Sequence, residues 1–83
     1  MNCFSNHLKL SVGKQLKDLR EKGGYSRSYL AEELNYSYYI YGLKENGLSP
    51  ITIDDLVNIA DFFKIHPSDI LSLAEQHVLN RSN

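Results

Sequence analysis

The side chains that could carry out chemistry in this 83-residue chain are few and scattered. The three histidines, His7, His66 and His77, do not have the spacing of metal ligands with one another or with the single cysteine, Cys3. The pair Gly23-Gly24 lacks the preceding strand and the Lys-Ser/Thr ending of a phosphate-binding loop. No pair of residues is a candidate for nucleophilic or acid–base catalysis. The sequence therefore predicts a protein that is not an enzyme and uses neither a metal nor another cofactor.

The stretch from Tyr25 to Gly47 predicts two short helices joined by a tight turn. Ser26 is a candidate N-cap for the first helix, whose inner face would be formed by Leu30, Ala31 and Leu34. Residues 35–37 form the turn, and residues 38–45 form the second helix, which ends at Asn46-Gly47. A small residue such as alanine allows two helices to cross closely. The pattern is typical of the helix-turn-helix of DNA-binding proteins.

Three further helices are expected, one before this stretch and two after it. Helical spacing of leucine and valine predicts one over residues 8–22, ended by the glycine pair, and leaves residues 1–7 as a flexible arm. A fourth helix begins after Thr52, which forms a capping box with Asp55, and a fifth is expected after Ser68, ending near His77. No segment has the alternation of a strand. The prediction is an all-α fold with five helices, a single domain over residues 8–79 and a tail at residues 80–83.

These segments together resemble the lambda-repressor-like (Cro/repressor, XRE) helix-turn-helix family. Residues 12–20 (VGKQLKDLR) resemble its first helix, Leu30-Ala31 its Leu-Ala pair, residues 50–60 its loop and fourth helix, and residues 63–71 its closing segment. The resemblance covers residues 10–71. It implies a regulator, bacterial or encoded by a phage or mobile element, that binds double-stranded operator DNA as a homodimer, here expected to be a repressor.

Two registers are possible for the second helix of the pair. Counted without a gap from the family pattern, Tyr41 and Lys44 are buried and Glu45 stands where the family has a glutamate that often pairs with the first-helix arginine, here Arg20. With the turn shortened by one residue, Ile40 and Leu43 are buried instead. Burying these two side chains stabilises by roughly 1.5–3 kcal/mol each. A partly exposed ion pair contributes about 0–1 kcal/mol, so the shortened turn is the prediction.

Candidate DNA contacts follow from this register. Arg27, at the start of the first helix of the pair, stands where the family usually has a glutamine that holds the DNA backbone. The remaining candidates on the second helix and its ends are Ser37, Tyr38, Tyr39, Tyr41, Lys44 and Asn46. Tyrosine can donate a hydrogen bond to DNA, and its ring can lie against a thymine methyl group. Lys44 and Asn46, at the far end of the helix, are candidates for phosphate contacts. The outward face before them lacks the arginine, asparagine and glutamine side chains that usually read bases. Sequence discrimination is therefore expected to be weak or partly based on DNA shape.

The fifth helix supplies a candidate dimer contact. In short members of the family this helix often joins two subunits, and its apolar stripe is formed by Ile70, Leu71, Ala74, His77 and Val78. A dimer would place two recognition helices about one DNA turn apart, near 34–36 Å.

Charge distribution leaves a second function class open. The net charge is −1, but residues 1–47 carry a net +2 and residues 48–83 a net −3. A cationic half suits a protein that presents one face to phosphates. The tyrosine-rich second helix and the acidic total instead favour a protein-interaction module, such as an antirepressor, an antitoxin-like partner or an adaptor. No membrane span or signal peptide is evident, so the cytoplasm is the expected location.

Overall fold

The structure is a computed structural model that describes residues 3–81, except for the side chains of residues 3–6, 77, 78, 80 and 81. All regular structure in this range is helical, which confirms the all-α fold class. The five helices are α1 (Cys3–Gly23), α2 (Arg27–Glu33), α3 (Tyr38–Glu45), α4 (Ile53–Phe63) and α5 (Pro67–Arg81). No helix of the described residues is both long enough and apolar enough to span a membrane.

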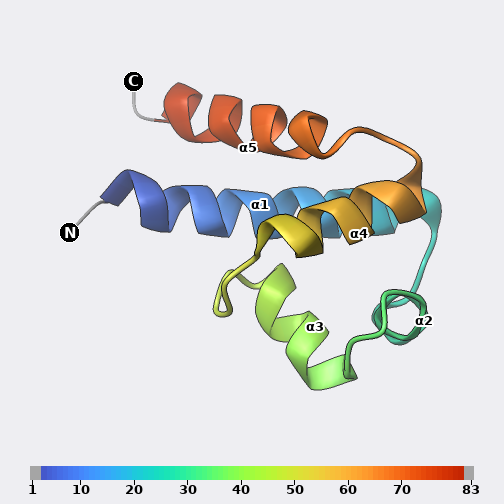
Figure 1. Ribbon diagram of the computed structural model, residues 1–83. Coiled ribbons are helices and arrows are strands. Elements are labelled where there is room, and N and C mark those ends of the chain that lie inside the picture. Colours follow the sequence, from blue (N-terminus) through green and yellow to red (C-terminus); the bar gives the residue numbers. More distant parts are fainter. Residues whose placement is uncertain (1–2, 82–83) are drawn as a thin grey trace.

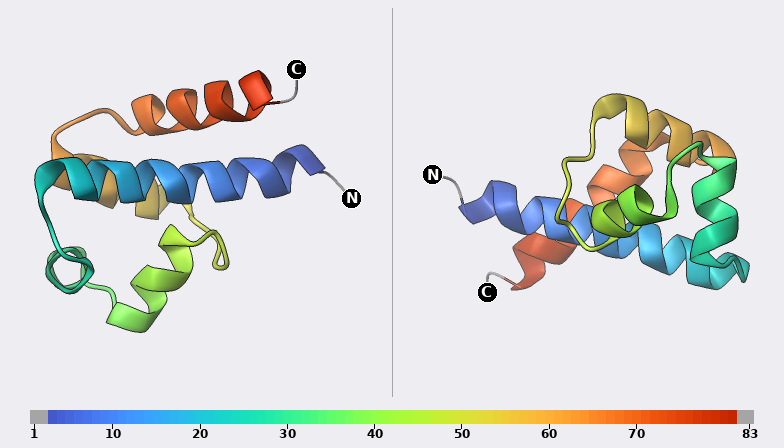
Figure 2. Two further views of the ribbon diagram at one scale, coloured as in Figure 1. Left: turned by 180° about the vertical axis from the view of Figure 1, so that it is seen from behind. Right: turned by 90° about the horizontal axis from the view of Figure 1, so that it is seen from below.

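Helix α1 is the central element of the fold. Helix α5 runs back along it in the opposite direction, and α2 and α3 lie together on its other side (Figure 1). The reverse view and the view from below show the same arrangement (Figure 2). The Ser11 hydroxyl of α1 donates to the Ala74 carbonyl of α5 at 2.9 Å, which joins the two long helices at mid-length.

The turns are fixed by caps that the sequence predicted. Ser26 accepts a hydrogen bond from the backbone N–H three residues later, and Thr52 forms a complete capping box with Asp55. Asn35 has a φ of 63°, so it supplies the left-handed residue that ends α2. The N–H of Tyr36 then donates to the Ala31 carbonyl at 2.9 Å, which closes the turn before α3 begins.

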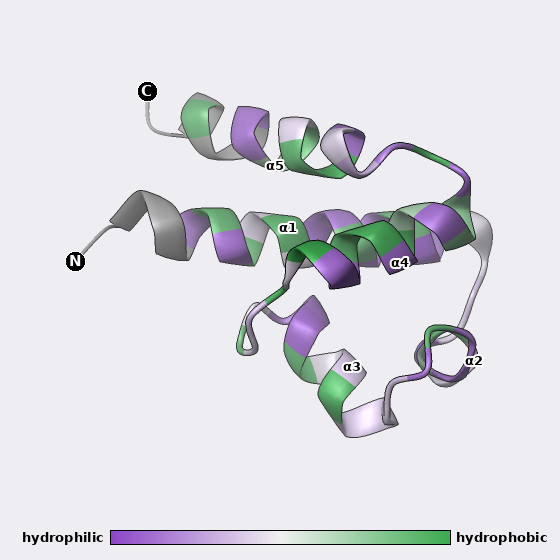
Figure 3. Cartoon of the chain, viewed as in Figure 1, coloured by the Kyte–Doolittle hydropathy of each residue, from purple (hydrophilic) through white to green (hydrophobic). Residues whose placement is uncertain are grey.

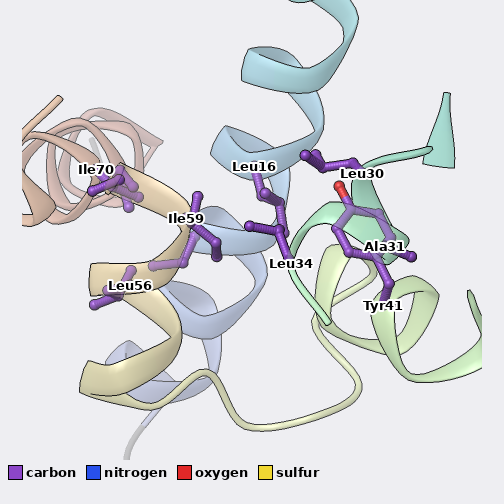
Figure 4. Close-up of a cluster of buried hydrophobic side chains, with 11 residues drawn as sticks. Leu16, Leu30, Ala31, Leu34, Tyr41, Leu56, Ile59 and Ile70 are labelled. Carbon is purple, nitrogen blue, oxygen red and sulfur yellow. The ribbon is translucent and has the colours of Figure 1, made fainter. Parts of the chain in front are cut away.

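The core draws on all five helices. Figure 4 shows Tyr41 of α3 in the same cluster as Ala31 of α2, Leu34 at the C-terminal end of that helix, and Leu16 of α1. The buried members of this cluster are Val12, Leu16, Leu30, Ala31, Leu34, Tyr41, Leu56, Ile59, Ala60, Ile70 and Ala74. Helices α2 and α3 contribute side chains to the same core as α1 and α5. The helix-turn-helix that they form is therefore packed as part of a single domain.

Both long helices differ from their predicted limits. Helix α1 begins at Cys3, so most of the arm predicted at residues 1–7 is helical; Phe4 continues the four-residue spacing of Leu8 and Val12. Helix α5 begins at Pro67, and Ser68 is not its cap. Proline is suited to the first helical position because it needs no N–H partner there. Helix α5 also continues to Arg81, beyond the predicted end near His77.

Gly13 allows α1 and α3 to approach closely. A Cβ atom at this position would lie 2.5 Å from the Glu45 carbonyl oxygen and 2.9 Å from the Lys44 carbonyl oxygen. Both atoms belong to the backbone, so they cannot move aside as a side chain could. A Cβ at Gly42, on the other side of α3, would meet nothing within 4 Å.

These two glycines give a matched test of the α1–α3 contact. We expect Gly13→Ala to reduce the free energy of unfolding by about 1–3 kcal/mol, because the added methyl group forces the backbones apart. Gly42→Ala should instead raise it by up to about 1 kcal/mol through helix propensity. Urea unfolding of both variants measures the difference. Equal effects from the two substitutions would show that the close approach is absent.

Candidate nucleic-acid interface

A buried glutamate joins the three N-terminal helices. The Glu45 carboxylate accepts hydrogen bonds from Arg20 of α1 at 2.8 and 3.2 Å, and from Arg27 of α2 at 2.9 Å. The Tyr41 hydroxyl donates to it at 2.6 Å. The Glu45 side chain is 0% exposed, while that of Arg27 remains 34% exposed. We call these four residues the Glu45 cluster; it fixes the position of α3 against α1 and α2.

The pKa values in the cluster follow from burial and pairing. Burial raises the pKa of Glu45, but the hydrogen bonds from Arg20 and Tyr41 outweigh it, so the pKa lies below its ordinary range. Burial, and then the bond to the carboxylate, raises the pKa of Tyr41. The hydrogen bond to Glu45 raises the pKa of Arg20. The cluster therefore holds Glu45 as an anion and Tyr41 as a neutral donor.

A second polar cluster joins α3 to α4. The Lys44 ammonium donates to the Asp55 carboxylate and to the Pro50 carbonyl, both at 3.0 Å, and lies 5.3 Å from the centre of the Tyr36 ring. The Tyr36 hydroxyl donates to the same carboxylate. Asp55 also accepts from the Thr52 N–H at 2.8 Å. We call Tyr36, Lys44, Thr52 and Asp55 the Asp55 cluster; together with the Glu45 cluster it joins α3 to α1, α2 and α4.

The register predicted for α3 is wrong. Tyr41 is fully buried and Lys44 is nearly so, whereas Ile40 is 38% exposed and Leu43 is only half-buried. Tyr41 buries a whole aromatic side chain, and Lys44 buries its alkyl chain while its charge is paired. The ion pair of Glu45 belongs to a buried network, so the small value of an exposed pair does not apply to it.

This correction divides the predicted DNA contacts. Tyr41 and Lys44 point into the protein, so neither is available to DNA. Tyr38 and Tyr39 are 59% and 72% exposed, and Asn46 is exposed at the end of the helix. The Ser37 hydroxyl accepts a hydrogen bond from the Ile40 N–H at 3.1 Å, so its first role is the N-cap of α3. Contact of the exposed residues with DNA remains a prediction.

Beside the start of α3 lies an open depression with a cationic lining. It is lined by Lys17, Arg20, Glu21, Ser26, Arg27, Ser28 and Tyr38. Three cations face one acid, and Arg27 is held there by its bond to Glu45 while part of its side chain stays exposed. Ser28 was not among the residues predicted to contact DNA. Its position next to Arg27, at the start of the first helix of the pair, is the sequence feature that could have indicated it. The depression adjoins the exposed tyrosine at position 38.

The residues predicted for dimerisation are mostly core residues. Ile70 and Ala74 are buried in the core of this chain, and Leu71 packs against that core, so these three do not form an exposed stripe. His77 and Val78 lie outside the residues whose side chains are described. The exposed leucines of α5 are Leu73 and Leu79. The helical spacing of the apolar residues in α5 was predicted correctly. The side of α5 that was assigned to a second copy instead faces the core of this chain.

The Asp55 cluster predicts an acid-dependent loss of stability. Burial opposes ionisation of Asp55, but hydrogen bonds, first from Tyr36, lower its pKa from 3.8 to about 2. The stability from this shift is therefore fully present above about pH 5 and is lost as the pH falls through about 4 to 2. It amounts to about 2 kcal/mol. Asp55→Asn should flatten the pH dependence of unfolding in this window, and the exposed Asp54→Asn should retain it. Equal pH profiles for the two variants would contradict the assignment.

Comparison with known proteins agrees with this geometry. A helix-turn-helix family model matches residues 16–70. Two crystal structures of the clp gene regulator ClgR from Corynebacterium glutamicum have the same fold: one at 21% identity and a TM-score of 0.77, covering 84% of this chain and 91% of that chain, the other at 20% and 0.83, covering 90% and 80%. No curated protein matches the chain. The chain belongs to the lambda-repressor-like helix-turn-helix family.

Proposed function

We propose that the protein is a DNA-binding transcription regulator that inserts α3 into the major groove. The observation that carries this is the arrangement of α3: its inner side is locked by the two polar clusters, and its outer side is exposed next to a cationic depression. The recognition helix of a helix-turn-helix presents the residues of its first turns to base edges, while the preceding helix crosses the backbone. In this chain those parts are Tyr38 and Tyr39 of α3, and the start of α2.

Arg27 is the strongest candidate for a phosphate contact. Its Nε atom is held by Glu45, so the guanidinium is oriented before DNA arrives. Its side chain stays partly exposed and lines the depression together with Lys17 and Ser28. A guanidinium whose orientation is fixed loses less freedom when it binds a phosphate than a free surface lysine does. Arg27 and its neighbours would set the position of α3 on the duplex, without reading the sequence.

The proposed regulator acts as a homodimer and represses transcription. The exposed leucines of α5, Leu73 and Leu79, support a contact between two copies. Helix α5 lies on the opposite side of α1 from α2 and α3, so such a contact would leave α3 free for DNA (Figure 1). Two copies related by a two-fold axis would bind half-sites one turn apart, about 34–36 Å. Repression requires only that the protein occupy promoter DNA. The structural relatives bear the description of a gene regulator, which is consistent with this role.

One observation favours a second candidate, a protein-interaction module. The exposed side of α3 carries Tyr38, Tyr39 and Ile40, which are side chains also enriched at protein interfaces. Salt dependence separates the two functions. Binding to DNA phosphates weakens steeply with salt, with a log–log slope on the order of −0.9 per neutralised phosphate, whereas an apolar protein contact responds little.

The decisive experiment begins with a random pool of DNA duplexes. Duplexes retained by the protein are sequenced, and the affinity for the selected duplex is measured at several salt concentrations. We expect a site with two symmetric halves, and an affinity that falls with salt. Arg27→Ala should weaken binding by roughly tenfold and reduce the salt slope by about 0.9.

Lys64→Gln is the matched control. It removes one positive charge at the end of α4, where the chain turns toward α5 and away from α2 and α3 (Figure 1). This variant should keep the affinity and the salt slope of the original protein. If no duplex is retained by the folded protein, the DNA-binding proposal fails and the protein-interaction module takes its place. If Arg27→Ala binds as well as Lys64→Gln, the phosphate assignment is wrong.

A further inference from the structure

The outward side of α3 is a stripe of four residues with a distinct chemistry. Tyr39, Gly42, Leu43 and Asn46 follow one another at intervals of three, one and three, which places them on one side of a helix, opposite the buried residues of the two polar clusters. Figure 3 shows the early part of α3 in pale and green colours and its end in purple. We call these four residues the outer stripe.

The outer stripe has little capacity to read bases through paired hydrogen bonds. Bidentate recognition uses arginine or lysine for guanine and asparagine or glutamine for adenine. Between Tyr38 and Leu43 the chain has none of these side chains, and Asn46 lies beyond the last residue of the helix. What the stripe offers is an aromatic ring and an alkyl side chain. In the major groove the matching apolar feature is the C5-methyl group of thymine.

Gly42 is an independent sign that a surface comes close to this side of α3. A glycine inside a helix costs roughly 0.5–1 kcal/mol relative to alanine. No contact within the described chain accounts for it, because a Cβ there would meet nothing within 4 Å. An external surface that packs against the backbone between Tyr39 and Leu43 would account for it.

Charge identifies that surface as DNA. The cationic depression adjoins the start of α3, because Tyr38, the residue before Tyr39 of the outer stripe, lines it together with Arg27 and Lys17. A polyanion that contacts these cations brings the adjacent groove over α3. An apolar peptide would leave Arg27 facing no acceptor beyond Glu45.

We propose that the outer stripe recognises thymine through its methyl groups, with Tyr39 and Leu43 as the side chains in contact and Gly42 as the point of closest approach. This inference rests on the DNA-binding function proposed above. It adds the chemical group that determines sequence preference: steps rich in thymine, identified by shape and apolar contact more than by hydrogen bonds.

The test compares duplexes that contain thymidine with duplexes that contain deoxyuridine, whose base differs only in lacking the C5-methyl group. The probe is the duplex selected from the random pool, with each thymine replaced in turn. We expect affinity to fall about fourfold for each methyl group whose contact is lost. Replacement of thymines outside the selected site should have no effect.

Two protein variants show whether α3 is responsible. Tyr39→Ala should reduce the difference between thymine and deoxyuridine at the position that it contacts, as in a double-mutant cycle. Tyr39 is 72% exposed, so this change leaves the core intact. Val57→Ala, at an exposed apolar residue of α4, should keep the full difference. Gly42→Ala should bind the selected duplex at least tenfold more weakly, although its fold is not weakened.

The outcomes separate this inference from the function on which it rests. Salt-dependent binding of a selected duplex that is unchanged by every deoxyuridine replacement would overturn the methyl-group inference and leave the DNA-binding function standing. Failure to retain any duplex would overturn both. Loss of affinity at defined thymines, reduced by Tyr39→Ala at the position that it contacts and retained in full by Val57→Ala, would support the inference.

Discussion

The structure depends on one constraint: the Glu45 carboxylate has no exposed surface and must find its partners inside the protein. Arg20 and Tyr41 meet it from α1 and α3, and Arg27 meets it from α2. A buried charge without partners is costly, so only an arrangement that brings these three helices together is tolerated. The close approach of α1 and α3 at Gly13 occurs at the same residue, since a Cβ there would meet the Glu45 backbone. Orientation of the helix-turn-helix is thus set by electrostatic pairing as much as by apolar packing.

This constraint determines what α3 can offer to a partner. Once Glu45 and Lys44 are both committed to internal partners, the helix has no charged side chain left for its outer side. Positive charge comes from the neighbouring helices instead, chiefly from Arg27, which the same glutamate orients. In the proposed complex, position on the duplex and choice of sequence would therefore depend on different elements. The start of α2 would hold phosphates, and tyrosine and leucine on α3 would meet base edges. The proposed readout of methyl groups follows from this division.

Much of the fold was predictable from local chemistry, and the orientation of α3 was not. Caps such as Ser26 and Thr52 are read from a few neighbouring residues, so the order of the helices and the starts of α2 and α4 were predicted correctly. The register of α3 depended on partners distant in sequence, because Glu45 meets Arg20 and Arg27 only in the folded chain. Treating that pair as partly exposed underestimated it. The dimer contact was assigned to the wrong side of α5 for a similar reason. An apolar stripe indicates that one side of a helix is buried, but it does not indicate whether this chain or a second copy covers that side. Ile70 proved to belong to the core.

The measurement that tests this account most directly is the free energy of unfolding of Glu45→Gln, compared with Glu33→Gln at an exposed glutamate of α2. Both changes remove one negative charge and preserve the shape of the side chain. The account predicts that Glu45→Gln costs about 3–5 kcal/mol, because Arg20 would remain buried without its counter-charge, while Glu33→Gln stays within about 0.5 kcal/mol of the original protein. Similar stabilities for the two variants would show that the Glu45 cluster does not hold α3 in place. That result would contradict the proposal that this cluster presents the outer side of α3 to DNA.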